Sequence, residues 1–288
     1  MNYEGQICRA PMERASYMLP VAVGCAYNKC KFCMLFKHLK YRELDLGFIE
    51  EEILRVKKLG GSPKKVFLGD GNAFGMDTRR LLAICQMLND NFENIESINM
   101  DATVTNISEK TDEELKALKT AGIECLYIGI ESGLDDVLLQ MQKDHTLSEA
   151  YEQIERIKAY GFSYAAHIMT GVAGKGHGIE NAEKTAEFLN RTKPVSVTNF
   201  SMFVHKSAPL YADILKGRFE PADELECIRE QRKLIELLDI SDLQFDSFND
   251  YIEFRVRGNL PIDKNKMLAQ MDKKIEEKSG ENIIAMVE

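Results

Sequence analysis

The sequence lacks several features that would assign it to whole classes of protein. Its uninterrupted apolar stretches are a few residues long, well short of the roughly 20 residues that a membrane-spanning helix needs. The opening stretch MNYEGQICRAPMER contains no apolar signal-peptide core. No composition break marks a linker, and no segment is of low complexity. We therefore expect a cytoplasmic globular protein without a membrane anchor.

Positive charge is also scarce. The 288 residues include 37 Lys and Arg against 46 Asp and Glu, which gives a formal net charge of −9. Because phosphates are neutralised by Lys and Arg, this balance does not favour a nucleic-acid partner, although a local basic patch would suffice. A hydrophobic content of 44% and a charged content of 29% are ordinary for a globular protein that folds without disulfides.

Short apolar runs alternate with helical patterns along most of the chain. The predicted strands cover residues 17–23, 66–68, 98–104, 125–130, 162–169 and 195–203. The predicted helices cover residues 48–59, 78–88, 111–122, 146–161, 180–191, 221–238 and 264–278. Two of these helices begin with a capping box, Thr111 with Glu114 and Thr146 with Glu149.

Six consecutive β/α units predict an α/β fold, a parallel sheet curled into a partial (βα)6 barrel. Right-handed crossovers place the loops that follow the strands on one face, where β/α folds carry their chemistry. We expect a core over residues 1–212 and a mainly helical C-terminal extension over residues 213–288 that packs on the barrel. Residues 242–261 of this extension predict an irregular or short-strand segment.

Three of the seven cysteines, Cys25, Cys30 and Cys33, form a C-x4-C-x2-C run after the first predicted strand. An odd number of thiols at this spacing does not form a disulfide framework, and a reducing cytoplasm favours metal binding or catalysis. A structural zinc site closes with four ligands, and His38 is a candidate fourth. A four-iron cluster bound by three thiolates instead leaves one iron open for an outside ligand.

Phe32 stands between Cys30 and Cys33, and this run resembles the cysteine motif of the radical S-adenosylmethionine (radical SAM) superfamily, C-x3-C-x-φ-C with φ aromatic. The first gap is one residue longer here than in the usual motif. Within the superfamily the chain is similar to the catalytic domains of the Elongator and coproporphyrinogen-oxidase-like groups. The resemblance covers residues 17–212 and implies a [4Fe-4S] cluster on the three cysteines, with Phe32 beside it.

Further motifs follow in the family's order, and the resemblance implies their roles toward S-adenosylmethionine. Gly69, Asp70, Gly71 and Asn72 follow the second strand, where relatives receive the amino group of the cofactor. The alternative for this stretch is a simple tight turn.

Two later segments complete the implied cofactor site. Glu131, Ser132 and Lys143 are similar to the segment that contacts the ribose and carboxylate in relatives. Thr170 and Gly171 occupy the place of the adenine-contacting segment. A helix cap for Glu131 and a solvated helix position for Lys143 are the alternatives.

The resemblance implies an oxidoreductase or transferase. A flavodoxin or ferredoxin would supply one electron, S-adenosylmethionine would be cleaved to methionine and a 5′-deoxyadenosyl radical, and the radical would abstract hydrogen from a small-molecule or peptide substrate. The alternative is a non-catalytic iron–sulfur or heme-handling protein of the same fold. No second set of three cysteines is present, so an auxiliary cluster is not expected.

Several single residues are weaker candidates. Strand alternation puts Asp101 and Thr103 on one face of the predicted strand, where they are candidates to line the inside of the barrel. Three histidines lie in or after predicted strands. His167 is a core side chain or one near the substrate, whereas His177 and His205 are candidates for a lid or a substrate contact.

The remaining candidates are arginines and cysteines. Arg255 and Arg257 are candidate anchors for an acidic substrate, or partners of surface carboxylates. Cys85 and Cys125 fit buried inert thiols, while Cys8 and Cys227 are less defined.

Overall fold

The structure is a computed structural model that describes residues 4, 8–281 and 283–287. The chain forms two compact units. The first contains Met1–Asn28, Leu35–Ile128 and Glu152–Tyr164, and the second contains Lys29–Met34, Gly129–Tyr151 and Ala165–Glu288.

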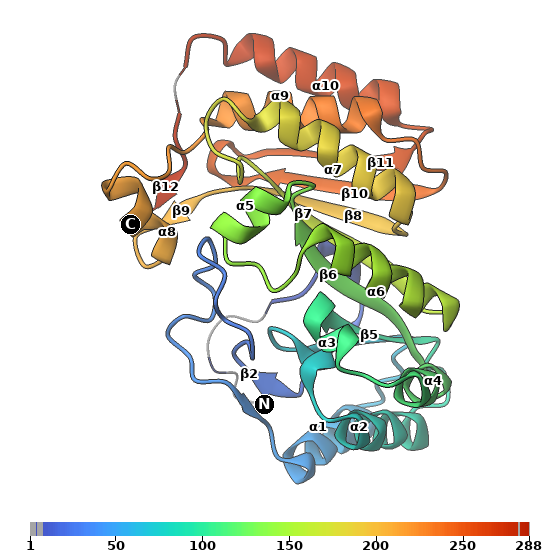
Figure 1. Cartoon of the computed structure of the whole chain (residues 1–288). Coiled ribbons are helices and arrows are strands. Elements are labelled where there is room, and N and C mark those ends of the chain that lie inside the picture. The colour runs from blue at the N-terminus through green and yellow to red at the C-terminus, as the bar shows by residue number, and fades with distance from the viewer. Residues whose placement is uncertain (1–3, 5–7, 282, 288) are drawn as a thin grey trace. The chain divides into compact units, whose positions relative to one another are not determined.

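The first unit is built on parallel strands (Figure 1). In spatial order they are β1 (Tyr17–Pro20), β4 (Lys65–Gly69), β5 (Ser97–Ala102) and β6 (Ile123–Glu131), which continues into the second unit. One register row pairs Leu19, Leu68, Met100 and Leu126, all with no exposed surface. Side chains that repeat at the same level of neighbouring strands therefore form the core of this sheet.

Helices follow the strands of the first unit. They are α1 (Leu46–Lys58), α2 (Thr78–Asn91), α3 (Val104–Ser108) and α4 (Asp112–Thr120). Asp45 caps α1, Asp77 caps α2, and Thr111 with Glu114 forms the predicted capping box of α4. A small antiparallel pair, β2 (Ala22–Val23) with β3 (Arg42–Glu43), brackets the cysteine loop in the sequence.

The second unit continues the alternation. Strands β7 (Ser163–Thr170), β8 (Ser196–Ser201) and β10 (Leu243–Asn249) run parallel, and β11 (Phe254–Leu260) pairs with β10 antiparallel. Helix α9 (Glu224–Leu237) packs on both α7 (Gly178–Thr192) and α10 (Lys264–Glu277) (Figure 1). The shorter elements are α5 (Asp135–Gln140), α6 (Leu147–Ala159), which crosses into the first unit, α8 (Pro209–Leu215), β9 (Val204–His205) and β12 (Met286–Val287).

The six predicted strands and the long helices are confirmed, with ends that move by a few residues. The strand predicted over residues 98–104 is wrong at its end, because Thr103 caps the short helix α3: its Oγ1 accepts from the Asn106 N–H at 3.2 Å. Thr103 is therefore not on the strand face that carries Asp101.

The segment predicted as irregular or short strands is a hairpin of two seven-residue strands, β10 and β11. Its hydrophobic alternation is hidden because Asp246, Ser247 and Asn249 are buried polar residues. Asp246 accepts from Arg255 on the other strand of the hairpin. The other two partners lie outside the hairpin: Ser247 accepts from Asn199, and the Asn249 amide donates to Glu224. Sequence periodicity cannot show a strand whose buried face is polar.

No helix among the described residues is both long enough and apolar enough to span a lipid bilayer.

Candidate functional site

The first arm of the cysteine loop is a closed turn within the first unit. Gly24 has a φ of 78° and Asn28 a φ of 44°. The Asn28 side chain donates to the Phe36 carbonyl oxygen at 2.8 Å, and Lys37 Nζ donates to the Asn28 carbonyl oxygen at 2.6 Å. Asn tolerates the left-handed conformation better than most residues. The longer first gap of the motif thus contains a turn with its own hydrogen bonds.

Gly71 lies directly against this arm. A Cβ at Gly71 would be 2.9 Å from both Cα and Cβ of Cys25, and closer still to the carbonyl oxygen of Gly24. Gly71 also has a φ of 33°, which favours glycine. The loop after β4 therefore lies beside Cys25, as expected if both serve one site.

Asp70 is buried in the same loop. Burial raises its pKa to about 6, although the N–H groups of Gly71 and Cys8 hydrogen-bond to the carboxylate and oppose the rise. Its Oδ1 has no hydrogen-bond partner among the described residues. A buried acceptor without a partner is costly in a folded protein, which suggests that a ligand donates to it.

Asn72 is half satisfied: its Nδ2 has a partner within the protein, whereas its Oδ1, like the Oδ1 of Asp70, has none among the described residues. Its Nδ2 donates to Asn106 Oδ1 at the start of α3, and its side chain is almost fully buried. Asn72 therefore connects the loop to α3.

The second arm of the cysteine loop belongs to the second unit. The Lys31 N–H donates to the Met141 carbonyl oxygen at 2.9 Å, and the Leu210 N–H donates to the Lys31 carbonyl oxygen at 2.9 Å. Lys31 Nζ forms an ion pair with Asp213 at 2.7 Å. Phe32 packs against an apolar cluster that includes Met141 and Leu210. The backbone and the aromatic side chain both fix the segment that carries Cys30 and Cys33.

Glu131 and Lys143 form a buried ion pair. Lys143 Nζ is 3.2 Å from Glu131 Oε1, and the two side chains are 7% and 11% exposed. Gly129 leaves the space for this pair, because a Cβ there would be 2.5 Å from Glu131 Oε1 and 3.1 Å from Lys143 Nζ. Burial lowers the pKa of Lys143, but attraction to Glu131 and to the Cys30 thiolate outweighs burial and raises the pKa overall. Lys143 therefore stays charged within electrostatic range of a cysteine of the motif.

Ser132 and the residue after it are anchored to α7. Ser132 Oγ donates to Asn181 Oδ1 at 2.5 Å and accepts from the Leu134 N–H at 3.1 Å. The Gly133 N–H donates to Thr185 Oγ1 at 2.9 Å. A Cβ at Gly133 would collide with the α7 backbone at residues 184 and 185. The hydroxyl of Ser132 thus fixes its own turn.

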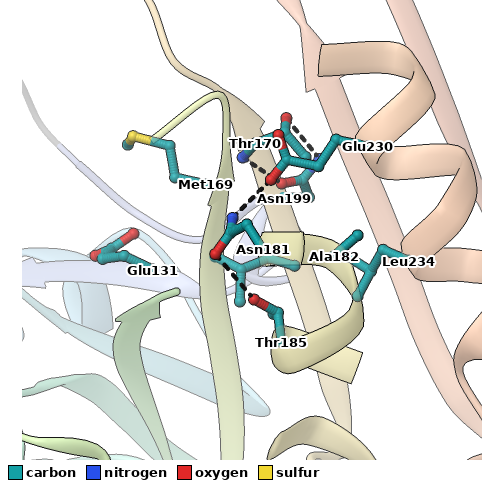
Figure 2. A pocket seen from close by; sticks show the side chains of 10 residues that line it. Glu131, Met169, Thr170, Asn181, Ala182, Thr185, Asn199, Glu230 and Leu234 are labelled. Atoms are coloured by element: carbon teal, nitrogen blue, oxygen red, sulfur yellow. Dashed lines mark hydrogen bonds between the residues drawn. The ribbon is translucent and has the colours of Figure 1, made fainter. Parts of the chain in front are cut away.

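Thr170 and Gly171 end β7 beside a small cavity of about 10 Å³, a volume that suits one water molecule (Figure 2). Asn199 bonds Thr170 twice, through the Thr170 N–H at 3.1 Å and Thr170 Oγ1 at 3.3 Å. The Gly171 N–H donates to Glu230 Oε2 at 2.7 Å. The cavity is lined by Glu131, Ile168, Met169, Thr170, Asn181, Ala182, Thr185, Asn199, Glu230 and Leu234.

The first unit also contains a group of acidic residues. Burial raises the pKa of Asp101 to about 7, and repulsion from Asp70 and Glu13 adds to the rise. Glu13 is itself buried, and its Oε1 accepts from Asn99 at 2.8 Å and from the Tyr127 hydroxyl at 2.7 Å. A carboxyl group with a pKa near 7 can exchange a proton at neutral pH.

The three candidate histidines differ in environment. Burial, with a smaller contribution from the charge of Lys143, lowers the pKa of His167 to about 4, so this imidazole is neutral at pH 7. His177 is exposed at the start of α7, 4.0 Å from Glu180. His205 Nδ1 hydrogen-bonds to the Ser207 hydroxyl at 2.7 Å.

Arg255 pairs with a buried acid. Its Nε donates to Asp246 Oδ1 at 2.8 Å, a second bond joins Nη2 to Oδ2, and the guanidinium lies 4.3 Å from the Phe248 ring centre. Arg255 thus provides the counter-ion of the buried Asp246, and its role as an anchor for an acidic substrate stays a prediction. Arg257 is exposed.

The cysteines outside the motif differ in burial. Cys85 and Cys125 are buried, as predicted, and burial raises the pKa of each thiol to about 12. Cys227 is buried too, whereas Cys8 is half-buried.

Sequence reasoning missed Glu230, Asn181, Glu13 and His145. His145 is buried beside Asp144, with Nδ1 3.0 Å from its carboxylate. One sequence signal was available for Glu230: it lies on the apolar stripe of α9, three residues after Cys227 and four before Leu234. A carboxyl group on such a stripe must find buried partners.

In the described part of the chain, no three or more His, Cys, Asp or Glu side chains are gathered to hold one metal ion. A four-iron cluster does not require this, because each cysteine binds a different iron. Lys143, which is charged and within electrostatic range of Cys30, fits a negatively charged group on this loop.

Comparison with known proteins identifies the class. Residues 19–189 match the model of the Radical SAM superfamily, and the chain belongs to this family. It is 26% identical over 205 residues to the heme chaperone HemW of Bacillus subtilis (strain 168), covering 68% of this chain and 53% of the relative. The chain thus spans about half the length of this curated relative.

Solved structures share the fold. Coproporphyrinogen III oxidase (HemN) from Escherichia coli matches with a TM-score of 0.58 and 14% identity, over 77% of this chain and 52% of that one. Elp3 of Methanocaldococcus infernus matches with a TM-score of 0.59 and 15% identity, over 93% and 64%. These likenesses, together with the parallel β/α alternation, confirm the predicted fold class of a partial radical SAM barrel.

Proposed function

We propose that this protein is a radical SAM enzyme in which Cys25, Cys30 and Cys33 hold a [4Fe-4S] cluster. The observation that carries the proposal is the buried pair of Lys143 and Glu131, 3.2 Å apart, which lies within electrostatic range of Cys30. A buried charge of this kind suits a site that binds an anionic group next to the cluster. A cluster held by these cysteines would supply one-electron reduction of S-adenosylmethionine, giving methionine and a 5′-deoxyadenosyl radical that would abstract hydrogen from the substrate.

The chain's own residues bind and orient the cofactor in this proposal. The backbone of Gly69–Asn72 and the unpartnered Oδ1 of Asp70 receive the amino group. Lys143 pairs with the carboxylate, and Glu131 accepts from the ribose. The side chains of Ser132 and Thr170 already hydrogen-bond within the protein. In this proposal these two residues therefore contact the cofactor through their backbone, and Thr170 also positions Gly171. Phe32 packs against the apolar side chains of the second unit and, in this proposal, covers the iron–sulfur cluster.

The substrate class in this proposal is a small molecule or a peptide. The electron donor is a flavodoxin or ferredoxin, and the reaction is an oxidation or a group transfer. We place the protein in the cytoplasm, where thiols stay reduced and can bind a metal cluster. The division into a core over residues 1–212 and an extension over residues 213–288 stays a prediction, and within the expected extension Glu230 contacts the loop after β7.

The test is reductive cleavage. The protein is reconstituted anaerobically with iron and sulfide, reduced with dithionite in the presence of S-adenosylmethionine, and assayed for 5′-deoxyadenosine. We expect turnover in the natural protein and in Cys85→Ala, a buried thiol outside the motif, and none in Cys30→Ala. A full cluster with bound S-adenosylmethionine but no 5′-deoxyadenosine would favour a carrier or an enzyme that cleaves the cofactor only when its substrate is bound.

The second candidate is a non-catalytic heme-handling protein, and the match to the heme chaperone HemW favours it. It predicts saturable binding of one heme per chain without formation of 5′-deoxyadenosine. A titration with hemin, followed by the Soret band, separates the two: stoichiometric binding without turnover supports the second candidate.

A further inference from the structure

Glu230 is a buried carboxyl group that lies 59 residues beyond Gly171 in the chain and contacts it directly. It is 1% exposed, on helix α9. Its Oε2 accepts from the Gly171 N–H at 2.7 Å, and its Oε1 accepts from Asn181 Nδ2 at 2.6 Å. Both oxygens therefore hold groups that would otherwise be buried without a partner.

Asn181 extends the network to a second loop. Its Oδ1 accepts from Ser132 Oγ at 2.5 Å, and Ser132 Oγ in turn accepts from the Leu134 N–H at 3.1 Å. Figure 2 shows Asn181 between Glu230 and Thr185 at the edge of the cavity. One carboxyl group thus reaches the loop after β7 directly and the loop after β6 through a single side chain.

The packing of α9 leaves little freedom at Gly171. A Cβ at Gly171 would be 2.7 Å from Cys227 Sγ, one turn before Glu230, and a Cβ at Gly178 would be 3.0 Å from Glu230 Oε2. Gly171 has a φ of 81°, a conformation that favours glycine. These contacts come from α9, which lies outside the residues 19–189 that match the family model.

We propose that Glu230 is a positioning residue for nucleoside binding, which holds Gly171 and, through Asn181, the turn at Ser132 in the arrangement that receives the adenosine part of S-adenosylmethionine. This inference rests on the proposed function, which assigns both loops to that cofactor. It adds that α9, in the C-terminal extension, is a required part of the nucleoside site. Without Glu230, the Gly171 N–H and the Asn181 amide lose their acceptor, and both loops relax.

The test measures the two halves of the cofactor separately on the full chain with a reconstituted cluster. Equilibrium dialysis gives the dissociation constants of 5′-deoxyadenosine and of L-methionine. In Glu230→Ala we expect the dissociation constant of 5′-deoxyadenosine to rise about fivefold to tenfold, as for the loss of one or two hydrogen bonds. That of methionine should stay within about twofold, because it depends on Lys143 and the loop after β4.

A general loss of stability is controlled by Ile235→Ala, which removes a buried apolar side chain from the same helix. This variant should melt earlier and leave the ratio of the two dissociation constants unchanged. An equal change of the ratio in Ile235→Ala, or no change in Glu230→Ala, overturns the inference. Failure of the natural protein to bind 5′-deoxyadenosine rejects the nucleoside site itself, and the inference with it.

Glu230→Gln keeps the test valid if the alanine variant does not fold. Its side chain retains an acceptor for the Gly171 N–H but offers Asn181 Nδ2 a weaker partner or a clash, so an intermediate rise is expected. Hydrogen exchange followed by mass spectrometry gives a readout independent of ligand. Amides of residues 169–176 should exchange faster in Glu230→Gln, while those of β8 stay protected; unchanged exchange at residues 169–176 contradicts the positioning role.

Discussion

The acidic group of the first unit and the ion pair of the second bury carboxyl groups in different ways. Asp70 and Asp101 have neighbours that are neutral or acidic, and burial raises their pKa values to about 6 and about 7. Glu131 has a buried lysine 3.2 Å away, and Lys143 stays charged. The first group changes its protonation near neutral pH, whereas Lys143 in the second keeps its positive charge.

The difference separates two chemical roles. A fixed ammonium group suits the binding of a carboxylate at any physiological pH, while a carboxyl group that titrates near pH 7 suits hydrogen bonding or proton exchange with a substrate. Glu230 shows that the second unit contains both kinds of acid. Burial raises its pKa to about 8, although Asn181 and the Gly171 N–H donate to it and oppose the rise.

The largest effect is expected from Lys143→Met, which removes the fixed positive charge of the second unit. It leaves Glu131 buried without its counter-ion, so the free energy of unfolding should fall by about 3–5 kcal/mol. Urea denaturation measures this. Lys175→Met, which breaks the exposed pair with Glu220, should cost no more than about 1 kcal/mol. Equal losses in the two variants would show that breaking the buried pair costs no more stability than breaking an exposed one.

A pH series tests the titrating acids. The folded-state pKa of Glu230 is about 8 and its ordinary value is 4.5, so between these values the unfolded chain has lost the proton that the folded chain keeps. Stability contributed by this group is therefore fully present below about pH 4.5 and lost as the pH rises through about 8. The expected loss is at most about 1.4 kcal/mol per pH unit.

The corresponding variant is Glu230→Gln, which cannot ionise. Urea denaturation at pH 5, 6, 7 and 8 should show a shallower fall in the variant than in the natural protein. Glu236→Gln on the exposed side of α9 should retain the natural slope. Parallel slopes in Glu230→Gln and the natural protein would mean that Glu230 is ionised throughout the range.

Gly71→Ala tests the close approach in the first unit. Its Cβ would collide with the backbone of residues 24 and 25, so we expect a loss of about 1–3 kcal/mol and less iron bound on reconstitution. Gly60→Ala is the matched control, with a φ of 78° and no atom within 4 Å of the added Cβ. It should lose about 1 kcal/mol from backbone strain and bind iron normally. Iron analysis and thermal melting measure the two effects. A full iron content in Gly71→Ala would show that the loop after β4 is not needed for cluster binding.

The smallest effect is expected at Gln231, next to Glu230 on α9. Its side chain is fully buried, and neither amide atom has a hydrogen-bond partner among the described residues. Gln231→Met keeps the volume and removes the unpaired polar atoms, so the protein should gain about 1 kcal/mol. A loss of stability in thermal melting would indicate that a buried water or ligand bonds to Gln231.

Some of the site followed from local sequence, because its signals are short in range. The C-x4-C-x2-C run, the glycines after β4 and the capping boxes each fit within a few residues, and the six β/α units follow from hydrophobic periodicity. The roles of the ten proposed cofactor residues and the three cysteines stay predictions. What the structure adds is that Ser132, Asn72 and Thr170 already bond within the protein.

The hairpin of β10 and β11 and the role of Glu230 did not follow from the sequence. Asp246 and Asn249 read as loop residues until Arg255 and Glu224 are seen to bond to them. Burial of a polar side chain depends on partners that only the paired strands or a separate helix provide, and no local pattern records them.

The sequence by itself determined the β/α alternation, the cysteine loop after the first strand and the family, because each depends on neighbours close in the chain. Only the tertiary structure decided which acids are paired and which titrate. Lys143 lies 12 residues from Glu131, and Glu230 lies 59 residues from Gly171. The charge state of a buried group depends on desolvation and on partners that folding brings within about 3 Å, and these exist only in the folded chain.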